Sequence, residues 1–333
     1  MIAVGSIAVS TLWQRFALRI PYDGRCDITT TIPRHSETPS AGGAPSDDYG
    51  AEDYSHGRIN MRTSIPFFLV HLLPLVAIFT GVTWTAVWLF IACYWGRMFF
   101  ITAGYHRYFS HRAYKTGRVF QFILAFGGSS AAQKGPLWWA GHHRMHHRYS
   151  DTPLDPHTPK KGFWWSHVGW ILGDETSAQP ENTMKEYASV PEVRFIDRHD
   201  WVAPWALGTL CFLIGGLPGL FFGFFGSTVL LWHSTFLINS LAHVLGSRRF
   251  ETTDTSRNNF ALAVLTMGEG WHNNHHRYAH LARQGLRWWE VDFSYWILCG
   301  LEKVGIVWDL KRPRPEWLEE KPTQSEEDLP VPD

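Results

Sequence analysis

The sequence predicts an all-α integral membrane protein with four transmembrane helices in two hairpins and a helical cap on the cytoplasmic side. Three observations support this prediction. Four apolar stretches occur in two pairs, the short links within the pairs carry no Lys or Arg, and basic residues gather between and beside the pairs. Charged residues make up 18% of the 333 residues, below the roughly one quarter that is usual in soluble domains.

The N-terminal region differs from the rest of the chain. Residues 33–57 are rich in Ser, Pro, Gly, Asp and Glu, a composition that cannot bury enough apolar surface to fold. We therefore predict a disordered N-terminal extension over residues 1–60. Met61, directly before the first apolar stretch, is an alternative start of the chain. Residues 313–333 are a polar C-terminal tail, so the membrane domain is expected to cover residues 61–312.

The first apolar stretch covers residues 64–84 and is nearly uncharged. Its length matches the roughly 20 residues that a helix needs to cross a bilayer core. An uncharged turn at Gly81, Val82 and Thr83 leads into a second stretch over residues 85–105. Together the two stretches predict a transmembrane hairpin.

A second hairpin is predicted further along the chain. Residues 202–222 and 224–245 are its two apolar stretches, and an uncharged, Gly-rich link lies around residues 215–219. Between the hairpins, residues 119–132 predict a short apolar helix that is buried or lies at the membrane interface. Residues 133–200 are polar, aromatic and rich in His, as expected of a cap outside the bilayer.

The basic residues set the orientation of these spans. They avoid both hairpin turns, and they include Arg107, Arg112, Lys115, Arg118, Arg144, Lys160, Lys161, Arg248 and Arg249. By the positive-inside rule, the central segment and both termini face the cytoplasm. The expected location is a multi-pass position in a bacterial inner membrane rather than in the endoplasmic reticulum.

Net charge and cysteine usage exclude two classes of function. The formal net charge is zero and no basic tail is present, so nucleic acid is not an expected partner. The four cysteines are Cys26, Cys93, Cys211 and Cys299, and they form no CxxC pair. We interpret them as small buried side chains rather than as a disulfide framework or a thiolate metal site.

Eight of the 18 histidines fall into three groups. Two groups share the spacing i, i+3, i+4, which places three imidazoles on one face of a helix. The predicted topology puts all three groups on the cytoplasmic side of the membrane. Because neutral imidazole is the commonest metal ligand in proteins, the groups predict a metal site. They are His106 and His111; His143, His146 and His147; and His272, His275 and His276.

Two further residues extend this set. Asn239 and His243 lie four residues apart near the cytoplasmic end of the fourth predicted span, where an ionisable side chain indicates function. With His243 the chain offers nine imidazoles, which suits two metal ions with four or five ligands each. His142 and His233 are interpreted as outer or structural residues, and Glu269 at most as a partner of a metal ligand.

The ligand type narrows the choice of metal. Imidazole suits zinc, copper, iron or nickel. A lipid-side site with open coordination positions favours iron and dioxygen chemistry. A hydrolytic zinc site would present a Glu base in an HExxH motif, which the sequence lacks.

The three groups read His106-Arg-Tyr-Phe-Ser-His111, His143-Arg-Met-His-His147 and His272-Asn-Asn-His-His276. They resemble the three histidine boxes of membrane fatty acyl desaturases of the acyl-CoA delta-9 (stearoyl-CoA) type. The stretches Asp155-Pro156-His157, Asn239-Ser240-Leu241-Ala242-His243 and Gly268-Glu269-Gly270-Trp271 are similar too. The resemblance implies an O2-dependent oxidoreductase that inserts a cis double bond, at the delta-9 position, into a saturated acyl chain.

The resemblance also implies the cofactor and the site residues. Family members bind two iron ions through the boxes, and the residue at the position of Asn239 reaches one iron through water. They use dioxygen and two electrons, and they hold the acyl chain in a buried tunnel that Trp138, Trp139 and Thr235 are placed to line here. The nine histidines are also the implied catalytic residues. The implied metal-binding set is His106, His111, His143, His146, His147, Asn239, His243, His272, His275 and His276.

One departure from the family concerns the carrier of the acyl chain. Animal acyl-CoA enzymes have a basic Arg-Lys pair shortly after the His-Val-Gly-Trp stretch, where this chain has Gly173-Asp174-Glu175-Thr176. The expected substrate is therefore either a fatty acyl thioester or an acyl lipid. The candidates for phosphate contacts, or equally for contacts with the membrane surface, are Lys160, Lys161, Arg248 and Arg257.

No fused electron carrier is expected, because neither a His-Pro-Gly-Gly haem motif nor a GxGxxG fingerprint occurs in the sequence. Electrons are expected from a separate partner, such as a ferredoxin, a rubredoxin or a haem cytochrome with its reductase. Glu290, Asp292 and the basic cap are candidates for its docking surface.

Two other functions stay open on the sequence. A related hydroxylase or alkane monooxygenase also uses histidine boxes, although four residues separate His106 from His111 here, against three in many hydroxylases. A metal transporter or metal-storing membrane protein is a different class. Transporters bind their cargo near the bilayer midplane on broken helices, whereas these histidines are expected at the cytoplasmic ends of the spans.

Overall fold

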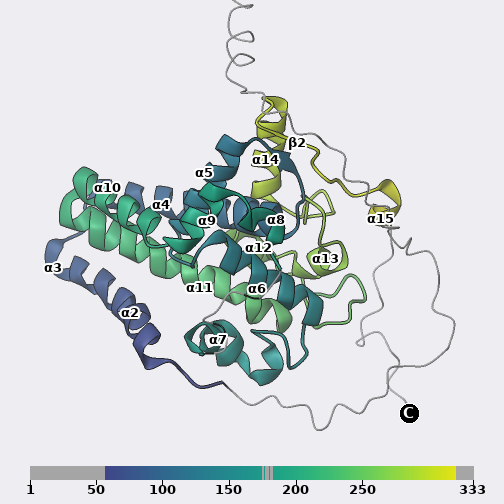
Figure 1. Cartoon of the computed structure of the whole chain (residues 1–333), viewed down its shortest axis with the longest axis horizontal. Coiled ribbons are helices and arrows are strands. Elements are labelled where there is room, and N and C mark those ends of the chain that lie inside the picture. Colours follow the sequence, from purple (N-terminus) through teal and green to yellow (C-terminus); the bar gives the residue numbers. More distant parts are fainter. Residues whose placement is uncertain (1–56, 175, 177–179, 181–182, 320–333) are drawn as a thin grey trace, which may run out of the picture. The chain divides into compact units, whose positions relative to one another are not determined.

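The computed structural model describes residues 57–174, 176, 180 and 183–319. Most of the predicted N-terminal extension and of the polar tail lies outside these residues. Within them helices dominate, and the strands form one short ribbon in which β1 (Lys115–Thr116) pairs antiparallel with β2 (Val307–Trp308) (Figure 1). A mostly helical fold is thereby confirmed.

The helices follow the two predicted hairpins and the segments around them, where η marks a 3-10 or π segment. The first apolar region holds α2 (Met61–Leu72), η1 (Leu73–Val76), α3 (Ala77–Thr80), α4 (Trp84–Phe99) and η2 (Phe100–Ser110). The middle of the chain holds α5 (Arg118–Ser129), α6 (Pro136–Tyr149), η3 (Pro159–Lys161), η4 (Trp165–Gly169), α7 (Trp170–Leu172), α8 (Lys185–Ala188) and α9 (Pro191–Arg198). The last third holds α10 (Val202–Pro218), η5 (Gly219–Gly226), α11 (Ser227–Asn239), η6 (Leu241–His243), α12 (Phe260–Leu265), α13 (His272–Arg277), α14 (Phe293–Lys303) and α15 (Pro315–Glu319).

The first hairpin turns where the sequence places it. Gly81 has a φ of +75°, a conformation that glycine adopts without steric cost. Two residues later, the hydroxyl of Thr83 accepts a hydrogen bond from the backbone N–H of Ala86 at 3.2 Å. This cap satisfies one of the free donors at the start of α4 and fixes where the second helix of the hairpin begins.

The second hairpin turns within the predicted link around residues 215–219, before the predicted end of its first stretch. Helical residues run from Val202 to His243, and 42 residues would extend about 63 Å, twice the bilayer core of about 30 Å. The chain breaks at Gly216 (φ +61°, ψ −152°) and folds back, so the predicted first stretch, 202–222, is too long. The return is tight, because a Cβ on Gly219 would lie 2.4 Å from the carbonyl oxygen of Cys211.

A buried arginine joins the two hairpins. The Arg97 guanidinium donates to the hydroxyls of Thr228 at 2.6 Å and Ser227 at 2.7 Å, and to the carbonyl of Cys93 at 2.8 Å. Nearby, Cys93 and Cys211 pack with Phe224 in a small apolar cluster. Both cysteines are free and buried, as the sequence predicts. These hydrogen bonds replace the water that the Arg97 guanidinium loses on burial. The buried arginine therefore holds α4 against α11.

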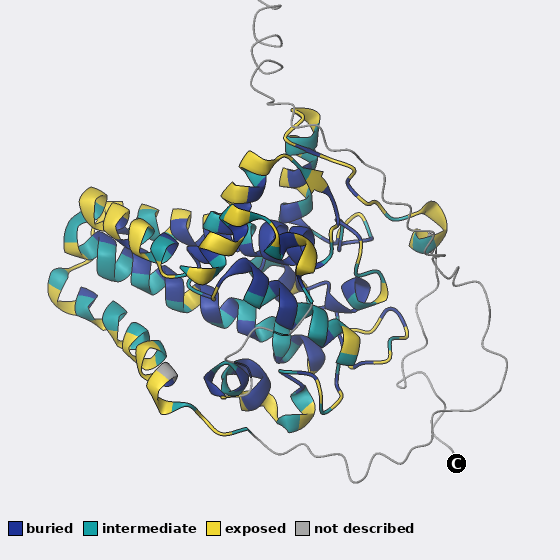
Figure 2. Cartoon of the chain, in the orientation of Figure 1, coloured by how far each residue is buried: buried dark blue, intermediate teal, exposed yellow. Residues whose placement is uncertain are grey.

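The hairpin helices expose large apolar side chains. Phe79 is 88% exposed and Leu213 is 73% exposed, and Figure 2 shows such exposed residues along α2, α3 and α10. Two helical stretches, Trp84–Ser110 and Val202–His243, are long and apolar enough to cross a membrane, and Ser64–Thr80 is a shorter apolar helix. Exposed apolar surface of this extent indicates association with a membrane.

The helices that carry the histidines pack around the main core. Buried side chains from η2, α5, α6, α9, α11 and α14 form this core. One carboxylate sets the start of α6, since Asp197 Oδ1 accepts from the backbone N–H groups of Leu137 at 2.8 Å and Trp138 at 3.0 Å. Pro136 at the first helical position lacks the N–H that would otherwise need a partner. The N-terminus of α6 is therefore fixed, and with it the position of the histidines that follow on the helix.

Candidate metal centre

The nine predicted histidines come together in two adjacent clusters. In each cluster, one ring nitrogen of every member lies within 4.8 Å of one from every other member. The rings of His147 and His276, one from each cluster, have centroids 4.5 Å apart. The five-histidine cluster is His106, His111, His143, His147 and His275, and the four-histidine cluster is His146, His243, His272 and His276.

Each helical histidine group is divided between the two clusters. On α6, His143 and His147 belong to the five-histidine cluster, whereas His146 belongs to the other. On α13, His272 and His276 belong together and His275 belongs to the other cluster. Residues four apart lie nearly above one another on a helix, whereas the residue at i+3 is rotated aside. One helix face therefore contributes ligands to both clusters. The sequence did not show which histidine belongs to which cluster.

A π-helical segment brings His106 and His111 together. In an α-helix, residues five apart point in directions that differ by about 140°. Segment η2 winds more widely, and the backbone N–H of His111 donates to the carbonyl of His106 at 3.2 Å. This i→i+5 bond aligns the two side chains, whose ring centroids lie 4.8 Å apart. The four-residue gap in the first histidine group thus matches one turn of a π-helix.

The distances within the clusters fit metal ligation. His143 Nε2 lies 2.8 Å from His111 Nε2 and 3.0 Å from His147 Nε2. Since an imidazole nitrogen holds one hydrogen or one lone pair, it cannot satisfy both neighbours by hydrogen bonding. Imidazole nitrogens about 2.1 Å from a metal ion and at right angles to each other lie about 3.0 Å apart. The residues present therefore fit a cation in the five-histidine cluster.

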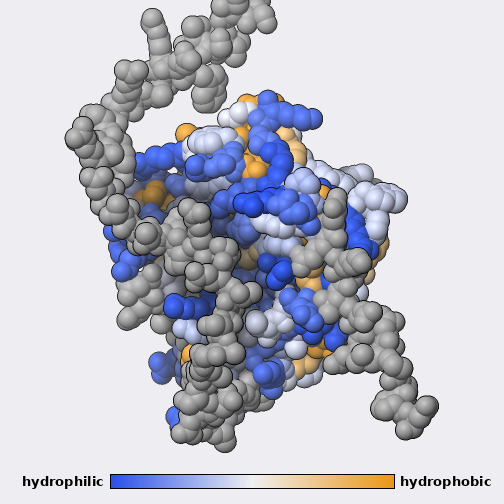
Figure 3. Space-filling model, turned by 90° about the vertical axis from the view of Figure 1, so that its right-hand side faces the viewer, coloured by the Kyte–Doolittle hydropathy of each residue, from blue (hydrophilic) through white to orange (hydrophobic). Residues whose placement is uncertain are grey.

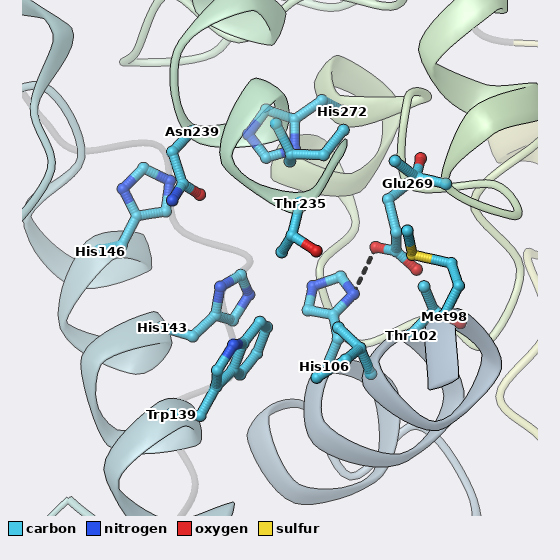
Figure 4. A pocket seen from close by; sticks show the side chains of 13 residues that line it. Met98, Thr102, His106, Trp139, His143, His146, Thr235, Asn239, Glu269 and His272 are labelled. Atoms are coloured by element: carbon cyan, nitrogen blue, oxygen red, sulfur yellow. Dashed lines mark ion pairs between the residues drawn. The ribbon is translucent and has the colours of Figure 1, made fainter. Parts of the chain in front are cut away.

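The four-histidine cluster has similar spacing. His272 Nε2 lies 3.1 Å from His243 Nε2, and His146 Nε2 lies 3.3 Å from His276 Nε2. Asn239 lies beside His146 and His272 in Figure 4, with its amide within the same cavity lining. The residues present therefore fit a second cation, whose coordination includes fewer imidazoles than the first.

Burial keeps three imidazoles of the five-histidine cluster neutral. It lowers the pKa of His143, His147 and His275 well below the usual value, and the neighbouring imidazoles lower it further. A neutral ring carries a lone pair on one nitrogen, which is the form that binds a metal ion. These three rings are therefore ready to bind a cation at neutral pH without first losing protons.

Carboxylates hold the outer nitrogens of the rings. Glu269 Oε2 lies 2.5 Å from His106 Nδ1, and Asp155 Oδ2 lies 3.0 Å from His146 Nδ1. Asp254 Oδ2 lies 2.7 Å from His276 Nδ1, and Asp151 Oδ1 lies 3.5 Å from His243 Nδ1. A carboxylate on Nδ1 keeps the proton there and directs the lone pair of Nε2 into the cluster.

Sequence reasoning missed most of these partners. Glu269 was expected in this role, and Asp155 was noted only as part of a matching stretch. Asp151 and Asp254 lie in connecting segments with no helical spacing to the histidines that they contact, so the sequence carries no signal that pairs them with His243 and His276. The partners become visible only when the segments that hold them are folded over the clusters.

Asp254→Asn is expected to weaken metal binding in the four-histidine cluster by about 10-fold to 100-fold. Burial opposes ionisation of Asp254, but hydrogen bonds from His276 and Ser256 outweigh it and hold the pKa of the carboxyl below its usual range. Asparagine keeps the shape and loses the charge that fixes the His276 tautomer. Metal content per chain, titrated against a competing chelator, measures the change. The control is Asp309→Asn at an exposed carboxylate paired with Lys115; an equal loss there would contradict the prediction.

Two cavities border the clusters, and a third, larger cavity adjoins one of them. The cavity in Figure 4 has a volume of about 40 Å³ and is bordered by His106, His143, His146, His272 and Asn239. A second, of about 30 Å³, lies beside Trp138, Trp139, His143 and Thr235, and a third, of about 380 Å³, shares Trp138 and Trp139 with it. The predicted tunnel residues Trp138, Trp139 and Thr235 thus all line cavities next to the clusters.

A hydrogen-bonded glutamine crosses this region. Gln133 Nε2 donates to Thr235 Oγ1 at 3.1 Å, and Trp139 Nε1 donates to Gln133 Oε1 at 3.2 Å. The three side chains therefore form a hydrogen-bonded wall where the larger cavity adjoins the smaller one beside His143. Gln133 was not singled out in the sequence, because it lies among small residues without a recognisable motif.

Four predicted phosphate-contact residues lie away from these cavities. Arg248 donates to the carbonyl of Asp254 at 2.9 Å, and Arg257 donates to the carbonyl of Gly246 at 3.1 Å. Lys161 lies over the Trp165 ring at 5.2 Å, and Lys160 is exposed. None of the four is among the described residues that line the three cavities.

The expectation that Glu290 and Asp292 form a docking surface was wrong. Glu290 is 7% exposed and Asp292 is 1% exposed. Glu290 accepts hydrogen bonds from the backbone of Leu286 and the side chain of Asn274, and Asp292 pairs with Arg107 at 2.9 Å. Both carboxylates are used to hold the segment after α13, which leaves them inaccessible to a partner.

Two other histidines lie outside both clusters. The ring of His142 bonds to the carbonyl of Trp138 in its own helix at 2.9 Å. His233 bonds to His71 and to His167, each at 3.0 Å, in a chain of imidazoles that ties α11 to α2 and η4. Neither contributes a nitrogen to the metal-type clusters, in agreement with their interpretation as outer or structural residues.

Comparison with known proteins agrees with this arrangement. The fatty acid desaturase family matches residues 82–298 of the chain. The sn-2 palmitoyl-lipid 9-desaturase of Nostoc sp. (strain 36) is 38% identical over 232 residues, covering 68% of this chain and 81% of the relative. The sn-1 stearoyl-lipid 9-desaturase of Anabaena variabilis is 38% identical over 258 residues, covering 76% and 94%.

The chain is also similar to a relative whose name gives CoA as the acyl carrier and carbon 5 as the position of the double bond. The acyl-CoA 5-desaturase of Anemone leveillei is 36% identical over 249 residues, covering 73% of this chain and 77% of the relative. The family match covers more than half of the chain, and it includes all three histidine groups. The resemblance to membrane desaturases is confirmed: the chain belongs to the fatty acid desaturase family and is an oxidoreductase that desaturates fatty acyl chains.

Proposed function

We propose that the protein inserts a cis double bond at carbon 9 of a saturated acyl chain that is esterified in a membrane lipid. The observation that carries this proposal is the pair of histidine clusters beside a narrow, mainly apolar cavity. The names of the Nostoc and Anabaena relatives support both the carbon position and the lipid carrier. In the overall reaction, the acyl chain gives up two hydrogens. These combine with dioxygen, two electrons and two protons to form two molecules of water.

We assign the cofactor as two iron ions, with dioxygen as co-substrate. The five-histidine cluster would hold one ion and the four-histidine cluster the other, with Asn239 beside the second. When bound, the metals supply the oxidising power that unactivated C–H bonds require. The protein supplies neutral imidazole ligands, carboxylates that orient them, and a cavity that excludes water from the reacting carbons.

The wall formed by Gln133, Trp139 and Thr235 positions the substrate. Its three side chains are fixed to one another by hydrogen bonds, and all of them border a cavity that reaches His143 and Asn239. An acyl chain that passes this wall must turn toward the clusters. A turn at fixed carbons favours a cis product and a single bond position, because flexible methylene groups are held in one conformation.

We propose four membrane spans in two hairpins, with the clusters and both termini on the cytoplasmic side. The turns at Gly81 and Gly216 and the exposed apolar side chains support the two hairpins. Figure 3 views the molecule from the side of α13 and α15 in Figure 1, and the described atoms on that face are mostly hydrophilic. On this assignment residues 61–312 are the catalytic membrane domain, in a bacterial inner membrane.

Electrons come from a separate carrier in this proposal, of the ferredoxin, rubredoxin or haem cytochrome type. The chain contains no haem-binding or dinucleotide-binding motif of its own. The carrier would approach the hydrophilic cap, since the clusters lie beneath that face and the opposite end of the spans is apolar. Electron transfer to a buried metal requires a short distance between the metal and the redox centre of the carrier.

Expression in a host that lacks the activity is expected to create cis-9 monounsaturated fatty acids in membrane lipids. Iron and an electron donor are supplied with the gene, and double bonds are located by mass spectrometry of the separated lipid classes. His276→Ala is the inactive control. Unchanged lipids would contradict the proposal, and a hydroxylated chain in place of a double bond would assign the related monooxygenase activity instead.

A further inference from the structure

The largest of the three cavities has walls from two different apolar helices. Pro66, Phe67 and Val70 of α2 line one side of it, and Pro204 and Trp205 of α10 line another. Pro204 and Trp205 lie in the first turn of α10, whereas Pro66, Phe67 and Val70 lie in the second and third turns of α2. In the proposed topology both helices enter the bilayer from the cytoplasm, so the two linings lie in the cytoplasmic half of the bilayer.

This cavity opens to the surface between these helices. Trp205 is 72% exposed and Trp201, just before α10, is 58% exposed, and both line the cavity. Tryptophan is enriched at the boundary between lipid tails and head groups. The mouth therefore has the composition of a surface that faces the membrane interface.

The α2 wall is held in place by specific contacts. The Phe67 ring stacks on Trp232 with centroids 5.3 Å apart and an interplanar angle of 7°. One turn later, His71 Nε2 lies 3.0 Å from His233 Nε2, and His233 Nδ1 lies 3.0 Å from His167 Nε2. These contacts fix α2 against α11 and keep the cavity open beside them.

The inner end of the cavity adjoins a smaller cavity beside the metal-type clusters. It shares Trp138, Trp139 and Phe236 with the smaller cavity that reaches His143 and Asn239. A chain that enters between α2 and α10 therefore meets the clusters without crossing the hydrophilic cap.

The charges at the mouth disfavour a soluble phosphate-rich carrier. Lys134 and Asp200 are the charged residues among the described ones that line the cavity, and their charges offset each other. The exposed Asp174 follows directly after the lining residue Gly173. Several phosphate groups in one ligand are usually bound by clusters of Arg and Lys, because each forms charge-assisted hydrogen bonds.

We propose that the mouth between α2 and α10 is a lateral portal, through which one acyl chain of a cytoplasmic-leaflet glycerolipid enters directly from the bilayer. The acyl chain of the lipid stays in apolar surroundings throughout, and the ester and head group remain at the interface beside Trp201 and Trp205. This inference rests on the proposed function and adds the route by which the substrate reaches the site.

Photolabelling of the full chain tests the portal. The protein is placed in nanodiscs of phosphatidylglycerol that contain a phosphatidylglycerol with a diazirine at the middle of one stearoyl chain. After illumination and digestion, we expect label on Phe236, which is 5% exposed and lies inside the cavity. Label on the lipid-facing Leu213, which is 73% exposed, is the internal standard for contact with bulk lipid.

Two matched variants separate portal entry from general damage. Val70→Trp fills the α2 side of the mouth, whereas Leu69→Trp places the same side chain on a neighbouring residue that is 54% exposed and does not line the cavity. We expect Val70→Trp to lower the ratio of Phe236 label to Leu213 label at least fivefold, and Leu69→Trp to leave it within twofold of the wild type.

Three outcomes would overturn the portal. They are wild-type label on Leu213 without label on Phe236, an unchanged ratio in Val70→Trp, and stronger Phe236 label from diazirine-stearoyl-CoA than from the lipid probe. The labelling needs no turnover and no electron donor. Strong Phe236 label in a protein that makes no unsaturated lipid in cells would therefore support the portal while contradicting the proposed function.

Discussion

His147→Ala and His276→Ala are each expected to lower desaturation below detection while the protein still inserts into the membrane. His147 belongs to the five-histidine cluster and His276 to the four-histidine cluster, so the two variants remove one ligand from each site. Both should be inactive, since the reaction is assigned to the pair of metals rather than to either one. Lipid analysis of expressing cells measures the loss.

Metal content should distinguish the two variants. The four-histidine cluster has fewer imidazoles, so His276→Ala should lower bound iron from two ions per chain toward one, whereas His147→Ala leaves four imidazoles in its cluster and should retain more. His199→Ala is the control, because the ring of His199 bonds to the carbonyl of Phe195, four residues earlier, and His199 belongs to neither cluster. Retained desaturation in His147→Ala or His276→Ala would refute the ligand assignment.

Arg107→Met is expected to destabilise the protein by about 3–5 kcal/mol, because it leaves two buried carboxylates without their cation. Arg107 is 1% exposed, and its guanidinium lies 2.9 Å from Asp292 and 3.1 Å from Glu269. Glu269 also holds the Nδ1 of His106, so the same substitution should weaken metal binding in the five-histidine cluster. In detergent, a loss of this size corresponds to a melting temperature lower by roughly 10 °C.

The control for Arg107 is an arginine of the same charge at the surface. Arg118 pairs with Glu192 at 2.7 Å, but its side chain is 66% exposed, so water replaces the lost contact. Arg118→Met should leave both the melting temperature and the metal content unchanged. A melting temperature for Arg107→Met equal to that of Arg118→Met would show that the buried triad of Arg107, Glu269 and Asp292 does not hold the site together.

The sequence predicted the ligands well because their signal is local. A helix repeats every 3.6 residues, so the spacing of His143, His146 and His147 already places them on one face. The same holds for the apolar stretches, whose length and lack of charge are read directly along the chain. Even so, the sequence did not show that His146 would turn to a different cluster from its two neighbours.

Other features depend on contacts between distant segments. Glu290 and Asp292 were candidates for a docking surface, but both are buried and hold Asn274, Arg107 and backbone donors. Gly216 was one of several glycines in the second link, and only the packing of α10 against η5 selects it as the turn.

By itself, the sequence determined that this is a mostly helical, membrane-associated desaturase with nine candidate imidazole ligands, since composition and short-range spacing carry that information. Only the tertiary structure decided how the ligands divide five to four, which carboxylates orient them, and where the cavity opens. Asp254 meets His276, and Trp205 and Val70 line the same cavity, through folding that brings separate segments together. No local pattern records such pairings, because their free energy arises from burial and hydrogen bonds that exist only once the helices are packed.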